Sequence, residues 1–182
     1  MHGWTQELLT HLERSREQLL AAVAAVPERS RERSPGAGAW SVANVLAHLA
    51  RTEGQVAALL EKRSRPLLQA RAGASRPSSD GSIVACFDGA PVLDRSEPLQ
   101  APAFAAPDLS MTAAIAERRL SRARARLTSV VVRGDGVDLR RAQQAHHVFG
   151  ELDFYQWVLF AGYHEQRHAA QVLDVAGALR DA

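Results

Sequence analysis

The chain has 182 residues, of which 46% are hydrophobic and 23% charged, ordinary values for one globular domain with its own core. Its 22 basic residues, all but one of them arginine, oppose 20 acidic ones, and the resulting net charge of +2 does not indicate a polyanionic partner. No stretch approaches the ~20 apolar residues that span a bilayer, and the amphipathic, acid-containing N-terminus resembles no secretory signal, so we expect a cytoplasmic protein without a membrane partner.

Two amphipathic helices are predicted in the first third of the chain. Residues 3 to 26 carry leucines and valines at helical spacing with charged residues opposite, and Pro27 ends this helix. A second helix begins after Ser41, a good N-cap, and Trp40 can pack back on it as a hydrophobic staple. Its apolar stripe continues to Pro66, which we expect to end it.

The segment from residue 66 to residue 109 has a different composition. Six prolines and a Ser/Gly cluster argue against a long element, and "SIVACF" predicts a short strand or turn. A crossover of this length allows the helices on either side to run parallel. The only cysteine, Cys86, lies here without a neighbouring base. A single cysteine excludes an internal disulfide and a multi-thiolate zinc site. We expect the Cys86 thiol to be buried or incidental rather than a nucleophile.

Two further helices complete the predicted bundle. The third begins after Asp108 or Ser110 and ends near Val132, and the fourth begins with a capping box of Asp153 and Gln156 and continues to about residue 178. We therefore expect an all-α four-helix bundle, with one domain over residues 1–182 and a long crossover between helices two and three. Four arginines share the outer face of the third helix: Arg118, Arg119, Arg122 and Arg126. A solvated face is favoured over a nucleic-acid contact, because no aromatic residues interleave with these arginines.

The stretch "GYHEQRHAAQV" places His164 and His168 four residues apart on the apolar stripe of the fourth helix. Burying two imidazoles without partners would cost about 1–3 kcal/mol each, so they need either hydrogen-bond partners in the core or a metal ion. This spacing directs both rings at one point. His48, at the margin of the second helix's apolar stripe, is the best candidate for a third ligand. Three imidazoles would hold a borderline divalent cation and leave positions open for water or substrate.

The segment H-E-Q-R-H also matches the short zinc-protease pattern, in which Glu165 would be the general base. That pattern needs a third ligand downstream. The only carboxylates there are Asp174 and Asp181, Asp174 points away from His168, and no further histidine follows. The protease interpretation is therefore disfavoured.

Several motifs in this order resemble the DinB/YfiT-like superfamily over nearly the whole chain. They are Trp40–Ser41 with His48 at the end of "VLAHLA", the H-x-x-F-G element, and "YHEQRHAAQ" on the last helix. The resemblance implies a four-helix bundle with parallel second and third helices, and often a homodimer. It also implies one divalent metal ion, zinc or nickel in many relatives and iron or another metal otherwise, bound by His48, His164 and His168.

The chain departs from the family pattern at two places. Many relatives carry Glu at the position of Asn44, and the usual His-Pro before the F-G element is His146–His147 here. This pair is interpreted as a loop cap or surface feature, with a substrate-facing role for His147 as the alternative. Polar candidates around the ligands are Asn44, Thr52, Gln55 and Tyr163. Arg167 is interpreted as a structural hydrogen-bond donor, and His2 and His11 as surface or core-edge residues.

A neutral set of three imidazoles leaves most of the metal's charge uncompensated, so bound water or thiol would lose a proton more readily. Attack by metal-bound hydroxide and delivery of a metal-held thiolate are both open to such a site. The resemblance favours the second, because relatives include bacillithiol-, mycothiol- and glutathione-dependent transferases and thiol-dependent isomerases. We therefore expect a thiol S-transferase-like enzyme that acts on a small molecule with a low-molecular-weight thiol. The alternatives are a stress-linked DinB-like metal-binding protein without robust catalysis and a metal-dependent hydrolase of a small amide or ester.

Overall fold

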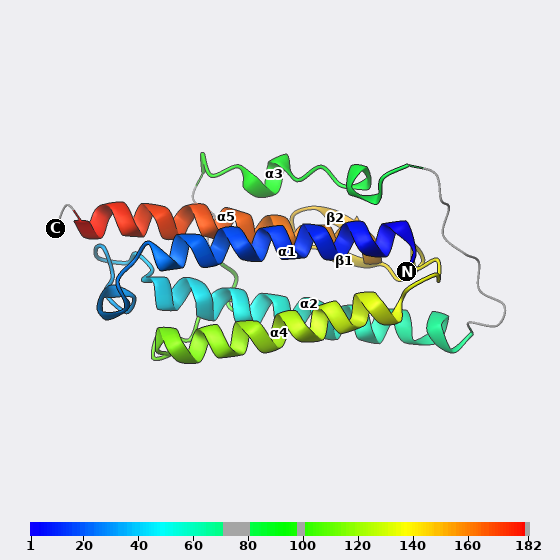
Figure 1. The fold of residues 1–182 in the computed structure, drawn as a ribbon, viewed down its shortest axis with the longest axis horizontal. Coiled ribbons are helices and arrows are strands. Elements are labelled where there is room, and N and C mark those ends of the chain that lie inside the picture. Colours follow the sequence, from blue (N-terminus) through cyan, green and yellow to red (C-terminus); the bar gives the residue numbers. More distant parts are fainter. Residues whose placement is uncertain (71–80, 98–100, 181–182) are drawn as a thin grey trace.

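The computed structural model describes residues 1–70, 81–97 and 101–180. Figure 1 shows its long helices packed side by side. They are α1 (Gly3–Ala24), α2 (Val42–Gln69), α4 (Ala113–Arg133) and α5 (Phe154–Arg180). Helices α1 and α5 run in one direction and α2 and α4 in the other, with α1 packed on α5 and α2 on α4. The predicted all-α bundle is thus confirmed, as is the parallel course of the helices that the crossover joins. Within the described residues, no helix combines the length and apolarity that crossing a membrane requires.

Local capping explains where the two helices that carry the site begin. At the start of α2, the Ser41 hydroxyl accepts from the Asn44 amide at 3.2 Å, and the Asn44 side-chain oxygen accepts from the Ser41 amide at 3.1 Å. At the start of α5, Asp153 and Gln156 exchange the same pair of hydrogen bonds at 3.0 Å. Both predicted helix starts are confirmed, because a capping box depends on neighbouring residues alone.

The end of α2 differs from the prediction. Pro66 lies inside the helix, which continues to Gln69, and the Ala70 amide donates to the Pro66 carbonyl at 3.1 Å. A proline inside a helix removes the hydrogen bond to the carbonyl four residues earlier, and its ring crowds that carbonyl. Leu67 and Leu68 follow it and pack against the hydrophobic core, and their burial compensates for the lost bond.

Among the residues that the structure describes, the buried core is divided into two apolar clusters. One includes Leu12, Val56 and Leu127, and the other includes Leu19, Leu49, Leu120 and Ala169. Between these levels, each of the four helices contributes a charged residue to the interior, and the four are Arg16, Glu53, Arg124 and Glu165. The bundle therefore has a polar layer at mid-height with apolar packing on both sides.

The first part of the crossover lies along the outer side of α1 and α5 (Figure 1). It contains η3 (Ile83–Cys86) and α3 (Ala90–Leu93). The predicted strand or turn at "SIVACF" is a 3₁₀ helix instead, because Ser82 caps the Val84 amide and the buried Ile83 packs into the core. The Trp4 indole N–H fixes this segment by donating to the Gly81 carbonyl at 3.0 Å. Parts of the predicted 66–109 crossover, residues 71–80 and 98–100, lie outside the described residues.

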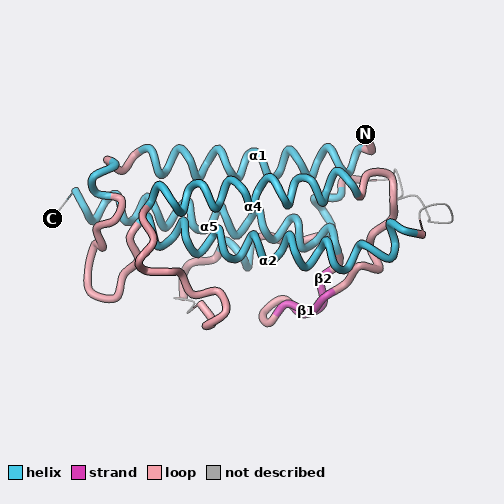
Figure 2. Tube along the Cα trace, turned by 90° about the horizontal axis from the view of Figure 1, so that it is seen from below, coloured by secondary structure: helices cyan, strands magenta, loops and turns pink. Residues whose placement is uncertain are grey.

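The connection between α4 and α5 contains a hairpin that the sequence did not predict. Strands β1 (Gln144–His146) and β2 (Gly150–Leu152) pair antiparallel, with His146 opposite Gly150. Figure 2 shows the hairpin beside α2, outside the four helices. Gly150 has φ 71°, a left-handed conformation that favours glycine. The hairpin places the two adjacent histidines at its tip, next to α5.

Candidate metal centre

The structure brings three histidines from two helices to one point inside the bundle. The His164 Nε2 atom lies 3.3 Å from Nε2 of His48 and 3.2 Å from Nε2 of His168. Nitrogens that bind one tetrahedral ion at about 2.0–2.1 Å lie ~3.3 Å apart. The three ligand atoms all lie within 4.8 Å of one another. These residues, the three that the sequence predicted, could therefore hold one metal ion.

Hydrogen bonds on the far side of two rings determine which nitrogen faces this point. The His48 Nδ1 atom lies 2.7 Å from the Ala105 carbonyl oxygen, and the His168 Nδ1 atom lies 2.7 Å from Gln171 Oε1. Since both partners are acceptors, Nδ1 carries the proton in each ring and Nε2 carries a lone pair. His164 Nε2 faces both lone pairs and has at most one proton to donate. A cation at this point would satisfy all three rings, so the donor set fits a metal ion.

Burial keeps these imidazoles neutral at physiological pH. It is the main cause that lowers the pKa of His48, and it lowers the pKa of His168 to about 3, with His48 adding to the effect. The pKa of His164 is lowered well below its usual value by burial and by its two histidine neighbours. A metal ion would therefore bind without having to displace a second proton from any ring.

A cavity of about 1330 Å³ opens beside the three imidazoles. The Trp40 ring lies 5.0 Å from that of His48, and the Phe160 ring stacks on His164 at 5.4 Å, measured between centroids. Further aromatic side chains on the cavity wall are Phe104, Phe149 and Trp157. The site is thus mostly apolar, with a few polar groups near the ligands, as is typical of small-molecule sites.

The structure separates the predicted polar candidates into two groups. Thr52, Gln55 and His147 line the cavity, whereas Asn44 and Tyr163 are not among the described residues that line it. Asn44 is held in the capping box of α2. The Tyr163 ring packs against His11 with 4.6 Å between centroids, on the side of α5 that faces α1 and the crossover.

The adjacent histidines of the hairpin have different environments. His146 caps the hairpin turn, where its Nδ1 accepts from the Val148 amide at 3.1 Å and the Phe149 amide at 3.3 Å. Burial, with a contribution from His147, lowers the pKa of His146 to about 4. His147 is exposed at the cavity. The loop-cap interpretation therefore describes His146, and the position of His147 leaves it free to face a ligand.

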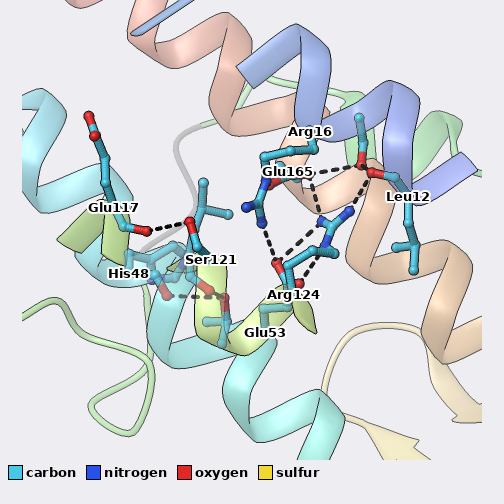
Figure 3. Close-up of polar contacts among 11 residues, drawn as sticks. Leu12, Arg16, His48, Glu53, Glu117, Ser121, Arg124 and Glu165 are labelled. Carbon is cyan, nitrogen blue, oxygen red and sulfur yellow. Dashed lines mark hydrogen bonds and ion pairs between the residues drawn. The ribbon is translucent and has the colours of Figure 1, made fainter. Parts of the chain in front are cut away.

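Glu165 does not face the imidazoles, although it lies between two of them in the sequence. Its carboxylate accepts from Ser15 Oγ at 2.8 Å, Arg16 Nε at 2.6 Å and Arg124 Nη2 at 2.7 Å. Figure 3 shows Arg124 between Glu165 and Glu53. This geometry is incompatible with the general-base role of Glu165 in the protease interpretation, because both carboxylate oxygens are bound by guanidinium groups.

The ion-pair layer is the main feature that the sequence interpretation missed. The arginines predicted on the outer arc of α4 are exposed, but Arg124, which was not in that set, is largely buried. The sequence does contain an indication of this layer. Arg124 lies between Leu120 and Leu127 on the apolar stripe of α4, and Glu53 lies between Leu49 and Val56 on that of α2. A charged residue in a core position predicts a buried partner of opposite charge.

Two other predicted residues, Arg167 and Cys86, have environments that fit a structural or incidental role. The Arg167 guanidinium donates to the Val92 carbonyl at 3.2 Å and also to the Asp94 carbonyl, so it holds α3 against α5 as a structural donor. Cys86 is exposed rather than buried, and it does not line the cavity. Partial desolvation of its sulfur by the surrounding chain, with a contribution from Asp153, raises the pKa of Cys86 to about 11, which agrees with an incidental thiol.

Comparison with known proteins adds one finding to this geometry. A family model described as the DinB superfamily matches residues 11–172, a range that includes all three candidate ligands. No curated protein and no solved structure matches the chain.

Proposed function

The chain belongs to the DinB superfamily, and from this premise we propose that it is a divalent-metal-dependent enzyme of the thiol S-transferase type. His48, His164 and His168 would be the metal ligands, with zinc or nickel as the first candidates and iron as another. The observation that carries the proposal is the convergence of three neutral imidazole nitrogens at the wall of a large, mostly apolar cavity.

A divalent ion held by this set would bind a low-molecular-weight thiol as its thiolate and so supply a nucleophile at neutral pH. In the overall reaction a carbon–sulfur bond forms, the thiol proton passes to solvent, and the group displaced from carbon leaves with its bonding electrons. The thiol has to be a cosubstrate, because Cys86 does not line the cavity and its raised pKa keeps it protonated.

The side chains around the imidazoles support a small, mainly apolar electrophile. Phe149, Trp157 and Phe160 form one wall of the cavity and would exclude water from the sulfur. Thr52 also lines the cavity, and its hydroxyl donates to the His48 carbonyl at 3.0 Å. This bond leaves the hydroxyl oxygen available as an acceptor near the ligands.

The test combines metal analysis with a thiol screen. Untagged protein is purified, its metal content is measured, and glutathione, mycothiol and bacillithiol are each supplied with 1-chloro-2,4-dinitrobenzene. We expect about one ion per chain and conjugation that is lost in His164→Ala but kept in His2→Asn, which retains an acceptor at the start of α1. Thiol-independent turnover of a small ester such as 4-nitrophenyl acetate, assayed in parallel, would favour a hydrolase. Bound metal without any turnover, together with a melting temperature that falls on chelation, would favour a binding protein.

A further inference from the structure

A short segment of the crossover, residues 101–107, lines one side of the cavity, and we call it the strap. Three side chains of α2 bind two successive carbonyls of the strap. The Phe104 carbonyl accepts from Arg51 Nε at 2.5 Å and from Gln55 Nε2 at 2.9 Å, and the Ala105 carbonyl accepts from His48 Nδ1 at 2.7 Å. The donors lie on one face of α2, because they are spaced three and four residues apart.

The strap is also held by its own turn and by the hairpin. The Ala105 amide donates to the Pro102 carbonyl at 2.8 Å, and Ala105 is buried with 4% of its surface exposed. The Phe104 ring meets the His147 ring edge-on, with 6.0 Å between centroids. These contacts direct the Ala105 carbonyl at the His48 ring and connect α2 with the hairpin.

His48 depends on this segment in a way that His168 does not. The acceptor for His168 is Gln171, three residues along the same helix, so it remains in place whenever α5 is folded. The acceptor for His48 is a backbone carbonyl 57 residues away. Without that carbonyl, the His48 ring could take the other tautomer, in which Nε2 carries the proton and cannot bind a cation.

We propose that Arg51 and Gln55 are positioning residues for the metal centre. They hold the strap so that the Ala105 carbonyl keeps the proton of His48 on Nδ1 and its Nε2 lone pair directed at His164 and His168. This inference rests on the metal site proposed above and is independent of the thiol chemistry. Binding is reciprocal in such a linkage, so an ion at the three imidazoles would in turn hold the strap against α2.

The experiment uses Arg51→Ala/Gln55→Glu, which removes one donor and places a carboxylate against the Phe104 carbonyl. The matched control is Arg65→Ala/Gln69→Glu, which makes the same changes at exposed positions farther along α2. Zinc affinity is measured by competition with a chromophoric chelator. We expect about tenfold weaker binding in the Arg51/Gln55 variant, as for other residues that orient a ligand, an unchanged melting temperature of the metal-free protein, and no change in the control. Arg51→Lys, which keeps a donor, should retain most of the affinity.

A second readout does not involve metal. Long-range ¹H–¹⁵N correlation spectra of the metal-free protein report the tautomer of His48, and we expect the Nδ1–H form in the wild type and a mixture in the Arg51/Gln55 variant. Unchanged zinc affinity or an unchanged His48 tautomer in that variant would overturn the positioning role and leave the metal site intact. A wild-type protein that binds no divalent ion would overturn both.

Discussion

Glu165 on α5 and Arg124 on α4 form an ion pair inside the bundle, with 2.7 Å between Oε2 and Nη2. Arg124 also binds Glu53 on α2, with Nε 2.6 Å from Oε1. Glu53 lies five residues after His48, and Glu165 lies between His164 and His168. Arg124 therefore connects the two helices that carry the candidate ligands, at about the level where those ligands meet.

Glu165→Gln should destabilise the protein by about 3–5 kcal/mol, because breaking a buried pair leaves an uncompensated buried charge. The side chain of Glu165 is only 1% exposed, and it accepts from two guanidinium groups. The matched control is Glu61→Gln, whose partners Arg126 and Arg133 are about half exposed and whose loss should cost at most about 1 kcal/mol. Urea unfolding measures both, and equal losses in the two variants would contradict a structural role for the buried pair.

Gly162→Ala should also destabilise the protein. A Cβ atom at this position would lie 2.2 Å from His11 Nε2, which donates to the Leu159 carbonyl at 3.0 Å. The His11 ring would have to move and lose that bond, at a cost of about 1–3 kcal/mol. In the double variant His11→Ala/Gly162→Ala the clash is absent, so the two losses should be less than additive. Strict additivity in thermal unfolding would show that the two residues do not interact.

The metal-free protein should lose stability in mild acid through its buried neutral imidazoles. The pKa of His146 in the folded protein is lowered to about 4 by burial and by His147, whereas an unfolded chain has a histidine pKa near ~6.5. Its contribution to stability is therefore complete above about pH 6.5 and is lost as the pH falls towards 4. With a chelator present, the stability of wild type should fall more between pH 7.5 and 4.5 than that of His146→Phe. Parallel curves for the two proteins would contradict the assignment.

Cys86 should be slow to react with iodoacetamide. A pKa of about 11 leaves roughly one thiol in a thousand as thiolate at pH 8. Folded protein should therefore be alkylated far more slowly than protein unfolded in urea, which serves as the control. Cys86→Ser should keep the metal content and any conjugating activity of the wild type. Loss of either in this variant would mean that the thiol takes part in the site.

Features that depend on neighbouring residues could be predicted from the sequence. The apolar stripes located the long helices, and the capping residues Ser41 and Asp153 located the starts of α2 and α5. The approach of His48 to His164 could be inferred because each residue lies on or beside an inward-facing stripe. The resemblance to the DinB/YfiT-like superfamily then pointed to the same three histidines as metal ligands.

Features that depend on residues far apart in the chain could not be predicted in this way. The acceptor for His48 is a carbonyl of the crossover, and a backbone carbonyl has no sequence signature. The continuation of α2 beyond Pro66 depends on the packing of Leu67 and Leu68 against the core. The charges of Glu53 and Arg124 were visible in their apolar stripes, but their pairing follows only from the parallel packing of α2 on α4.

X-ray absorption of the zinc-loaded protein tests the metal centre most directly. We predict one ion per chain with three imidazole nitrogens at about 2.0–2.1 Å, and loss of imidazole scattering in His48→Ala/His164→Ala/His168→Ala. An ion with no imidazole ligands, or an imidazole signal that persists in the triple variant, would show that the ion is bound elsewhere and that the three converging rings do not form the site.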